Sequence, residues 1–253
     1  MPGRHPKRRP APRSDPQGLR GKVALITGAS RGIGLAIAAA LAAEGCALAI
    51  TGRNQTALKK AAAQLAQYRM PILPVVCDVR DPQAVAALFA AVRRRFHRLH
   101  ILVNNAGIAH PGLPVDKLPV EAWAEVIETN LTGMFLVTQA ALSLMKRGSV
   151  IVNNLSIAAK KVFPGSSAYN ASKHGALGFT NTLREELRER GIRVVALLPG
   201  ATDTEIWNTL WPAAPRKKMM SPETVAQAVV SALSVADEST VEELTMLPSA
   251  GTL

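Results

Sequence analysis

Cysteine is scarce in this chain, and so are aromatic residues. Only Cys46 and Cys77 are present among 253 residues, and neither lies in a spacing typical of a metal site. We therefore predict two reduced, buried thiols and no disulfide. Aromatic residues make up 4% of the chain. A core built mainly from Ala, Val, Leu and Ile suits parallel strands that helices cover on both faces.

Long apolar runs are missing as well. No stretch approaches the roughly 20 apolar residues that a membrane-spanning helix requires, and the first residues lack the apolar segment of a secretory signal. We therefore expect no membrane partner and a cytoplasmic location. The five histidines show no ligand spacing with cysteines or carboxylates, so no metal site is predicted.

Acidic residues are outnumbered, 18 against 30 lysines and arginines, which gives a formal net charge of +12. The first 20 residues contribute +5 of this charge and contain five prolines. Because proline prevents a helix or a packed core there, we expect residues 1–19 to form a disordered basic arm. Contact with nucleic acid is the alternative for this arm. Since no basic stripe interleaved with aromatics accompanies it, no specific nucleic-acid partner is expected.

Short apolar runs alternate with longer Ala/Leu-rich segments after the arm. The expected strands are residues 22–27, 47–51, 72–77, 101–104, 149–155, 192–198 and 241–246. The expected helices are residues 33–44, 55–68, 82–96, 120–145, 168–190 and 222–233. Strands that alternate with helices of this length imply right-handed crossovers between parallel strands. The predicted fold class is therefore α/β, a Rossmann-like doubly wound parallel sheet of about seven strands with helices on both faces, in one domain over residues 20–253.

A glycine-rich turn follows the first expected strand and opens the first expected helix. It reads Thr27-Gly28-Ala29-Ser30-Arg31-Gly32-Ile33-Gly34. Glycines let the backbone approach a pyrophosphate, and a helix N-terminus offers free N–H groups. The spacing G-x-x-x-G-x-G departs from the G-x-G-x-x-G dinucleotide fingerprint, so the position between strand and helix carries the prediction. The candidate cofactor contacts here are Gly28, Ser30, Arg31, Gly32, Ile33 and Gly34.

The end of the second expected strand indicates which nicotinamide cofactor is bound. An acidic residue there would bind the ribose 2′-hydroxyl of NAD and repel the 2′-phosphate of NADP. This chain has Arg53 and Asn54 at that point and no carboxylate. Arg53 can pair with a phosphate dianion, and Arg31 can approach the same group. Two solvated surface arginines are the alternative, but NADP(H) is favoured over NAD(H).

Further motifs follow in order along the chain. They are Asn104-Asn105-Ala106-Gly107 after the fourth expected strand, Asn130, Ser156, Tyr169-x-x-x-Lys173, and Pro199-Gly200-x-x-x-Thr204 after the sixth. Together with the glycine turn, these motifs resemble the short-chain dehydrogenase/reductase family over nearly the whole chain after the arm. The resemblance implies cofactor contacts from Asp78, Val79, Asn105, Ala106, Gly107, Tyr169, Lys173, Pro199, Gly200, Thr202 and Thr204. For Asp78, a helix N-cap shared with Asp81 is the alternative.

The spacing of Tyr169 and Lys173 has a chemical purpose, because residues four apart share one face of a helix. A free tyrosine has a pKa of about 10, and a nearby ammonium lowers it. Such a tyrosine exchanges a proton with an alcohol or a developing alkoxide, while a nicotinamide carries the hydride. The resemblance makes Ser156 the group that polarises the substrate oxygen. It also makes Asn130 a residue that bends its helix and holds a water linking to Lys173.

The substrate is not defined by these motifs. The segment 203–221 is expected either to cover the substrate as an apolar lid or to pack on its own domain. Leu155 replaces a serine that is frequent in relatives, and the chain lacks the aspartate-glycine-glycine ending frequent in ketoacyl reductases. A 3-oxoacyl thioester and a general ketone or aldehyde both remain open. A catalytically silent NADP(H)-sensing regulator is the alternative of a different class. The helices at 120–145 and 168–190 resemble those that pair between subunits, which implies a homodimer or homotetramer.

Overall fold

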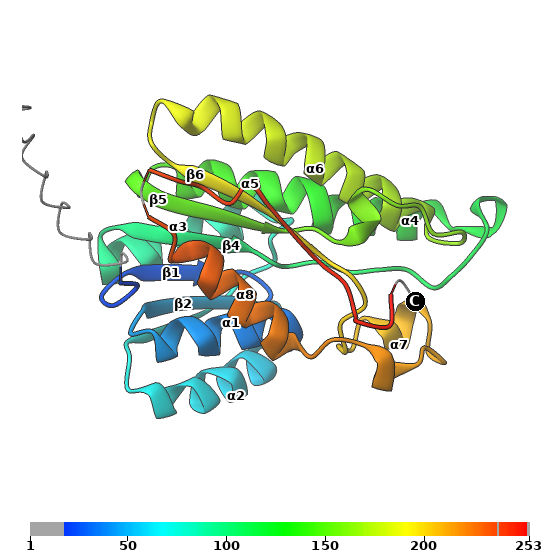
Figure 1. Cartoon of the computed structure of the whole chain (residues 1–253), viewed down its shortest axis with the longest axis horizontal. Helices are drawn as coiled ribbons and strands as arrows, with labels where there is room; N and C mark the ends of the chain where they lie inside the picture. Colours follow the sequence, from blue (N-terminus) through cyan, green and yellow to red (C-terminus); the bar gives the residue numbers. More distant parts are fainter. Residues whose placement is uncertain (1–17, 237, 252–253) are drawn as a thin grey trace, which may run out of the picture.

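The computed structural model describes residues 18–236 and 238–251, which form a seven-stranded parallel sheet between two layers of helices (Figure 1). The strand order is β3-β2-β1-β4-β5-β6-β7. This order reverses between β1 and β4, which is the switch point where doubly wound sheets bind dinucleotides. The predicted Rossmann-like α/β fold is therefore confirmed. Residues 1–17 of the expected basic arm lie outside the described residues.

The observed elements match the expected alternation of strands and helices. The strands are β1 (Val23–Ile26), β2 (Ala47–Gly52), β3 (Ile72–Val76), β4 (Leu99–Asn104), β5 (Met145–Asn154), β6 (Arg193–Pro199) and β7 (Glu243–Met246). The helices are α1 (Gly32–Ala43), α2 (Gln55–Leu65), α3 (Pro82–Phe96), α4 (Val120–Ile127), α5 (Gly133–Ala141), α6 (Ser167–Arg188), α7 (Trp207–Leu210) and α8 (Pro222–Leu233). The expected helix at 55–68 ends earlier, because its last turn tightens into a 3-10 turn over Ala66–Tyr68.

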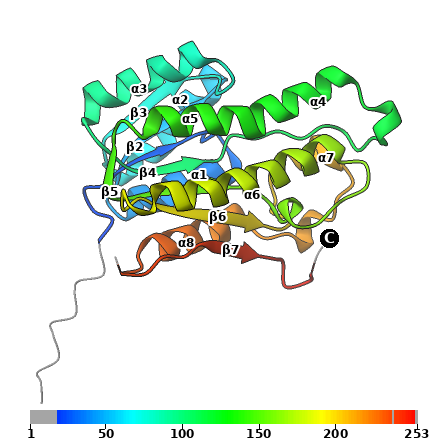
Figure 2. The same cartoon turned by 90° about the horizontal axis from the view of Figure 1, so that it is seen from above.

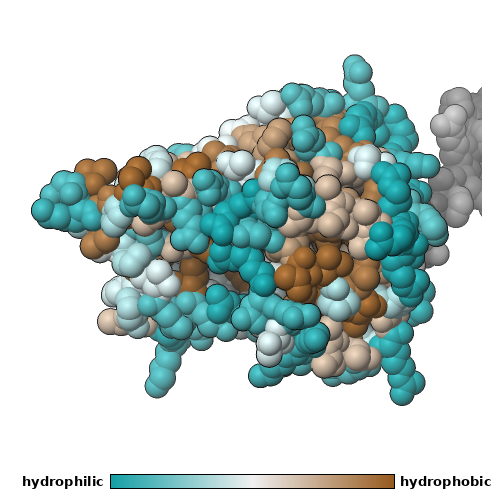
Figure 3. Space-filling view, turned by 180° about the vertical axis from the view of Figure 1, so that it is seen from behind, coloured by the Kyte–Doolittle hydropathy of each residue, from teal (hydrophilic) through white to brown (hydrophobic). Residues whose placement is uncertain are grey.

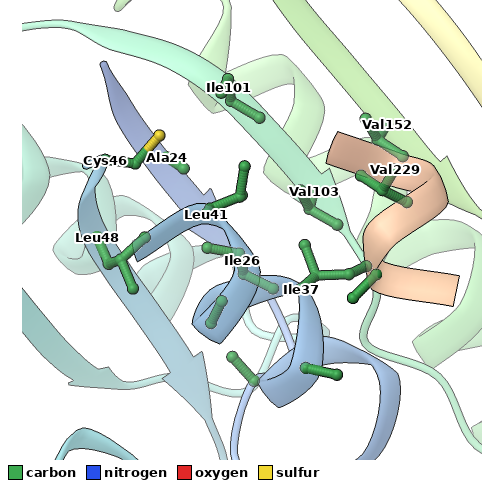
Figure 4. Packing of buried hydrophobic residues seen from close by; sticks show 14 of the residues in the cluster. Ala24, Ile26, Ile37, Leu41, Cys46, Leu48, Ile101, Val103, Val152 and Val229 are labelled. Carbon is green, nitrogen blue, oxygen red and sulfur yellow. The ribbon is translucent and has the colours of Figure 1, made fainter. Parts of the chain in front are cut away.

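Apolar side chains fill the space on both sides of the sheet. On one side, Ile37 of α1 and Val229 of α8 pack with strand residues such as Ile26 (Figure 4). On the other side, α3, α5 and α6 cover the sheet (Figure 2), and Leu88 and Leu183 belong to a second buried cluster. Complete burial of such a side chain stabilises the fold by about 1.5–3 kcal/mol. The two layers therefore hold the carboxyl ends of the strands in fixed positions.

The expected continuous helix at 120–145 is wrong in two respects. A π-helical turn over Glu128–Thr132 interrupts it, and the helix ends at Ala141. Strand β5 already begins at Met145, which is buried and pairs with Leu99. Burial and strand pairing override the helical pattern of these residues, and Gly148 adopts a φ of +83° where the strand becomes irregular.

Both cysteines are free and buried, which confirms the prediction of two buried thiols. Burial raises the pKa of each thiol to about 11. Within residues 18–236 and 238–251, no helix is long and apolar enough to cross a membrane.

Candidate active site

The glycine turn between β1 and α1 lies directly against the segment that follows β4. Gly28 has a φ of +63°, and a Cβ there would lie 2.9 Å from the Cα of Ala106. A Cβ at Gly34 would lie 2.3 Å from Asn105 Nδ2. The Thr27 hydroxyl accepts hydrogen bonds from the backbone N–H groups of Asn105 and Ala106 at 2.9 and 3.0 Å. The fold thus joins two of the predicted cofactor-binding segments, and side chains at either glycine would separate them.

The segment after β6 reaches the same turn. The Cγ2 atom of Thr204 would be 3.1 Å from a Cβ at Gly32, so Thr204 lies beside the glycine turn. Thr202 is buried, and its hydroxyl donates to the carbonyl of Gly200 at 3.1 Å. Its own carbonyl accepts a hydrogen bond from Trp207 Nε1 at 2.9 Å. The side chain of Thr202 therefore shapes its own turn.

Two arginines converge on one carboxylate beyond the ends of β2 and β3. Glu125 Oε1 lies 3.6 Å from Arg53 Nη1 and 3.5 Å from Arg80 Nη1. Arg80 also contacts both carboxylate oxygens of Asp78 at 2.7–3.0 Å, and this holds the pKa of Asp78 below its usual range. Paired guanidinium groups can bind a phosphate dianion in the same way. Sequence reasoning missed Arg80, although its place two residues after Asp78 was a usable signal.

The other residues that were predicted to bind the adenosine half of the cofactor hydrogen-bond or pair with neighbouring residues of the protein. Arg31 lies 3.9 Å from Glu205, whereas Arg53 is paired with Glu125. The Asn54 side chain accepts a hydrogen bond from Ala57 N at 2.8 Å and caps α2. Asp81 caps α3 through Gln83 N, which excludes the alternative N-cap role of Asp78. Ser30 faces the end of β2, where a Cβ at Gly52 would lie 3.4 Å from its hydroxyl, and Val79 is buried against Gly133.

Ser156, Tyr169 and Lys173 come together beside the end of β5. Ser156 follows this strand, and its hydroxyl lies close enough to the Tyr169 phenol of α6 to lower the pKa of that phenol. Lys173 is one helical turn further along, with its Nζ 5.5 Å from the centre of the Tyr169 ring. This Nζ donates to the carbonyl of Asn154 at 3.2 Å. Lys173 is 5% exposed, and burial lowers its pKa to about 8.

The pKa of Tyr169 shifts against the direction that the Tyr–Lys spacing predicts. Burial around the phenol raises this pKa, and the nearby Ser156 hydroxyl offsets only part of the rise. The physical reason is that the same low-polarity surroundings disfavour both the phenolate and the Lys173 ammonium. Tyr169 is therefore protonated at neutral pH, which is the form that donates a proton to a carbonyl oxygen.

Asn130 lies in the π-helical turn and is 1% exposed. Its Oδ1 accepts from Ile108 N at 2.8 Å, and its Nδ2 donates to Ile108 O at 2.9 Å and to Ser172 Oγ at 3.0 Å. The side-chain amide thus fastens the segment after Gly107 to α6. The expected relay water would therefore have to use the backbone carbonyl of Asn130, in a turn that holds one residue more than an α-helical turn.

The segment expected to form a lid is folded and anchored at its base. Thr202 and Met220 form a parallel bridge, and Asp203 N donates to Met220 O at 2.9 Å. Arg216 donates to Asp203 Oδ1 and to Thr204 O, both at 2.7 Å. Trp207 and Trp211 pack edge to face with ring centres 6.4 Å apart. We call residues 203–221 the flap.

A cavity of about 640 Å³ lies between α1, α8 and the flap. Its lining includes Gly32 and Thr204 but none of Ser156, Tyr169 and Lys173. The cavity therefore lies beside the glycine turn and away from these three side chains. Among the described residues, no group of three or more His, Cys, Asp and Glu side chains is placed to hold a metal ion.

A doubly wound sheet with a glycine turn at its switch point, and Ser156, Tyr169 and Lys173 grouped at the same edge, is an arrangement typical of oxidoreductases that bind a dinucleotide. The family model described as short chain dehydrogenase matches residues 22–214, and the chain belongs to this family.

Relatives of different activities are similar to this chain. A 3-oxoacyl-[acyl-carrier-protein] reductase of Synechocystis sp. is 38% identical over 195 residues, which cover 76% of this chain and 78% of that protein. A D-threitol dehydrogenase of Mycolicibacterium smegmatis is 40% identical over 195 residues, with 76% and 75% covered. The structure of an alcohol dehydrogenase from Thermococcus sibiricus complexed with 5-hydroxy-NADP has a TM-score of 0.85 at 33% identity, with 91% and 97% covered.

Proposed function

We propose that this protein interconverts a carbonyl and an alcohol by hydride transfer with NADP(H). The observation that carries the proposal is the grouping of Ser156, Tyr169 and Lys173 at the sheet edge that also bears the glycine turn. A bound nicotinamide would supply or accept the hydride. The chain itself would hold the substrate oxygen and exchange the proton.

Each catalytic side chain has a separate task in this proposal. In reduction, Tyr169 donates its phenolic proton to the substrate oxygen as negative charge develops there. The Ser156 hydroxyl donates a hydrogen bond to the same oxygen. Lys173 binds the ribose hydroxyls of the cofactor, and its ammonium stabilises the phenolate left on Tyr169. The Asn130 side chain holds the backbone of Ile108 in place. The backbone carbonyl of Asn130 would bind the expected water that links to Lys173.

The residues beyond β2 and β3 support NADP(H) over NAD(H). Arg53 and Arg80 already share the carboxylate of Glu125, so a 2′-phosphate would find two guanidinium groups that converge on one anion. The glycine turn fits the pyrophosphate, because its glycines leave room where side chains would block the approach. The neighbour of known structure from Thermococcus sibiricus is described as a complex with 5-hydroxy-NADP.

Two substrate classes fit the proposal, a 3-oxoacyl thioester and a general ketone or aldehyde. The similarity to a 3-oxoacyl-[acyl-carrier-protein] reductase favours the first class. Lys217 and Lys218 are exposed on the flap, where an acidic carrier protein would meet them, whereas Arg216 is used inside the flap. The similarity to a D-threitol dehydrogenase and the missing aspartate-glycine-glycine ending favour the second class.

An assembly of two or four copies is also part of the proposal. Trp123 of α4 and Phe135 of α5 are 39% and 44% exposed, and Val120 at the start of α4 is exposed as well, so apolar side chains gather on these two helices. The projecting end of the molecule that carries α4 shows apolar surface among polar side chains (Figure 3). Phe135 also packs edge to face on Phe179 of α6. Light scattering tests this point, and a monomer at micromolar concentration would contradict it.

The activity is tested by the loss of NADPH absorbance with ketones, aldehydes, quinones and 3-oxoacyl thioesters. We expect turnover with at least one compound, and the preferred compound chooses between the two substrate classes. Tight NADPH binding without turnover of any compound would contradict the proposed reaction and would support the NADP(H)-sensing alternative.

A further inference from the structure

Asn154 is the last residue of β5 and stands two residues before Ser156. It is 8% exposed, and its Nδ2 donates to Asn105 Oδ1 at 2.8 Å. Its backbone carbonyl is the acceptor for Lys173 Nζ. The residue therefore touches the catalytic lysine through its backbone and the segment after β4 through its side chain.

Asn105 extends this connection to the cofactor turn. Its Nδ2 donates to Thr27 O at 2.9 Å and to Gly28 O at 3.1 Å. A continuous path of hydrogen bonds thus runs from the glycine turn through Asn105 and Asn154 to Lys173. The path joins β1, β4, β5 and α6, which are the elements that carry the proposed site.

The other amide atom of Asn154 has no such partner. Its Oδ1 is buried and accepts no hydrogen bond from any described residue. A buried acceptor without a donor costs free energy. Other buried side-chain atoms of the described residues, such as Asn104 Oδ1, also lack a partner, and Asn154 differs from them by its hydrogen bond with Lys173. The position of this oxygen, on the residue that contacts Lys173, points to a donor on a molecule bound at the site.

Asn153 is a matched contrast in the same strand. It is fully buried, its Nδ2 donates to Thr180 Oγ1 at 2.9 Å, and its Oδ1 accepts from Asn104 Nδ2 at 2.9 Å. Successive strand residues point to opposite faces of the sheet. Of two adjacent asparagines, one is satisfied within the protein, and the one beside Lys173 keeps a free acceptor.

We propose that Asn154 Oδ1 accepts a hydrogen bond from the nicotinamide nucleoside of the bound cofactor, and that Asn105 holds the side chain in position for it. The inference rests on the proposed function, since it needs a nicotinamide cofactor. Asn154 is then a binding residue of the nicotinamide half, distinct from the arginines that serve the adenosine half.

The test compares two ligands and does not require a known substrate. NADPH contains the nicotinamide nucleoside, whereas adenosine 2′,5′-bisphosphate carries only the adenosine half with its phosphates. For Asn154→Leu we expect NADPH to bind about tenfold more weakly, the size of one lost hydrogen bond, and the bisphosphate to bind as in the wild type. Fluorescence titration or calorimetry measures both affinities.

Two further variants separate the contact from a general loss of structure. Asn153→Leu should lower the melting temperature and leave both affinities unchanged for the folded protein. Asn154→Asp keeps the shape but replaces the amide that donates to Asn105 Oδ1 with an oxygen, so it should also bind NADPH more weakly than the wild type and leave the bisphosphate affinity unchanged. If the leucine variant fails to fold, Asn154→Ala is measured in the same way.

Two outcomes would overturn the inference. These are unchanged NADPH affinity in Asn154→Leu and an equal loss of affinity for both ligands. The proposed function would stand in each case if the wild type still binds and oxidises NADPH. If the wild type binds neither NADPH nor the bisphosphate, the proposed cofactor itself is wrong.

Discussion

The side of the sheet where the carboxyl ends of the strands lie, called the edge below, and the flap are built in different ways. At the edge, side chains from β1, β4, β5 and α6 meet through buried hydrogen bonds such as those of Asn105 and Asn130. The flap satisfies its polar groups mainly with its own residues, for example where Arg216 binds Asp203. Trp211 of the flap is 45% exposed, whereas Lys173 of the edge is 5% exposed. Under the proposed function, the buried edge would carry out the reaction, and the more exposed flap would select the molecule that reacts.

The largest expected effect comes from Tyr169 at the edge. Tyr169→Phe removes the phenolic proton and keeps the ring, so we expect turnover to fall by about 10²–10⁴-fold, the range of general acid–base catalysis. NADPH binding should weaken by no more than about tenfold, the size of one hydrogen bond, because the expected cofactor contact of Tyr169 is a single hydroxyl. Steady-state kinetics and NADPH titration on the same preparation check both parts. Wild-type turnover in this variant would remove Tyr169 from the mechanism.

A smaller effect is expected at the adenosine end of the edge. Arg53→Asp replaces a guanidinium with a carboxylate, so NADPH affinity should fall by about 10–100-fold, as for a lost charge-assisted hydrogen bond. NADH affinity should rise, because the carboxylate can accept from the 2′-hydroxyl. Glu125→Gln is the matched opposite variant, and it should tighten NADPH binding by releasing both arginines. Unchanged NADPH affinity in Arg53→Asp would sink the proposed role of Arg53.

The buried Lys173 predicts how stability depends on pH. Its pKa is about 8 in the folded protein, below the 10.5 of a free lysine. Between these values the unfolded chain binds more protons, so stability rises with pH from about 8 to 10.5, by about 3 kcal/mol at most. Lys173→Met lacks this titration and is the control. Denaturant melts of both proteins across this range measure the difference, and parallel curves would contradict the lowered pKa.

The smallest effect is expected in the flap. Arg216→Ala removes the contacts to Asp203, Thr204 and Asn208 and should loosen the flap. We expect KM for the carbonyl substrate to rise by about threefold to tenfold, the effect of one or two exposed hydrogen bonds, with NADPH affinity nearly unchanged. Arg94→Ala, at an exposed arginine of α3 outside the flap, is the control. A loss of kcat as large as that of Tyr169→Phe would show that the flap takes part in the chemistry.

Much of the fold could be predicted from the sequence, and so could the grouping of Ser156, Tyr169 and Lys173. Both leave local patterns in the chain. The apolar runs defined the strands, and the spacing of Tyr169 and Lys173 placed them on one helix face. The start of β5 was missed, because Met145-Lys146-Arg147 has a helical pattern and only pairing with Leu99 makes it a strand.

Contacts between distant elements were the other part that the sequence left hidden. The raised pKa of Tyr169 follows from burial, which no local spacing reveals. The same holds for Arg80 and Glu125, which lie 45 positions apart by number and meet only through folding. The role of the Asn130 side chain in fastening Ile108 likewise depends on a contact across 22 residues.

The central claim is that the hydride passes from the nicotinamide to the carbonyl carbon while Tyr169 supplies the proton, and NADPH that carries deuterium at both positions of the nicotinamide C4 tests it most directly, with the carbonyl compound that the protein reduces best. We expect deuterium to appear on the carbinol carbon of the alcohol product. In Tyr169→Phe the rate of this transfer should be strongly lowered, although the variant still binds NADPH. Label that stays in the cofactor, or reaches the product at the same rate in Tyr169→Phe, would contradict it.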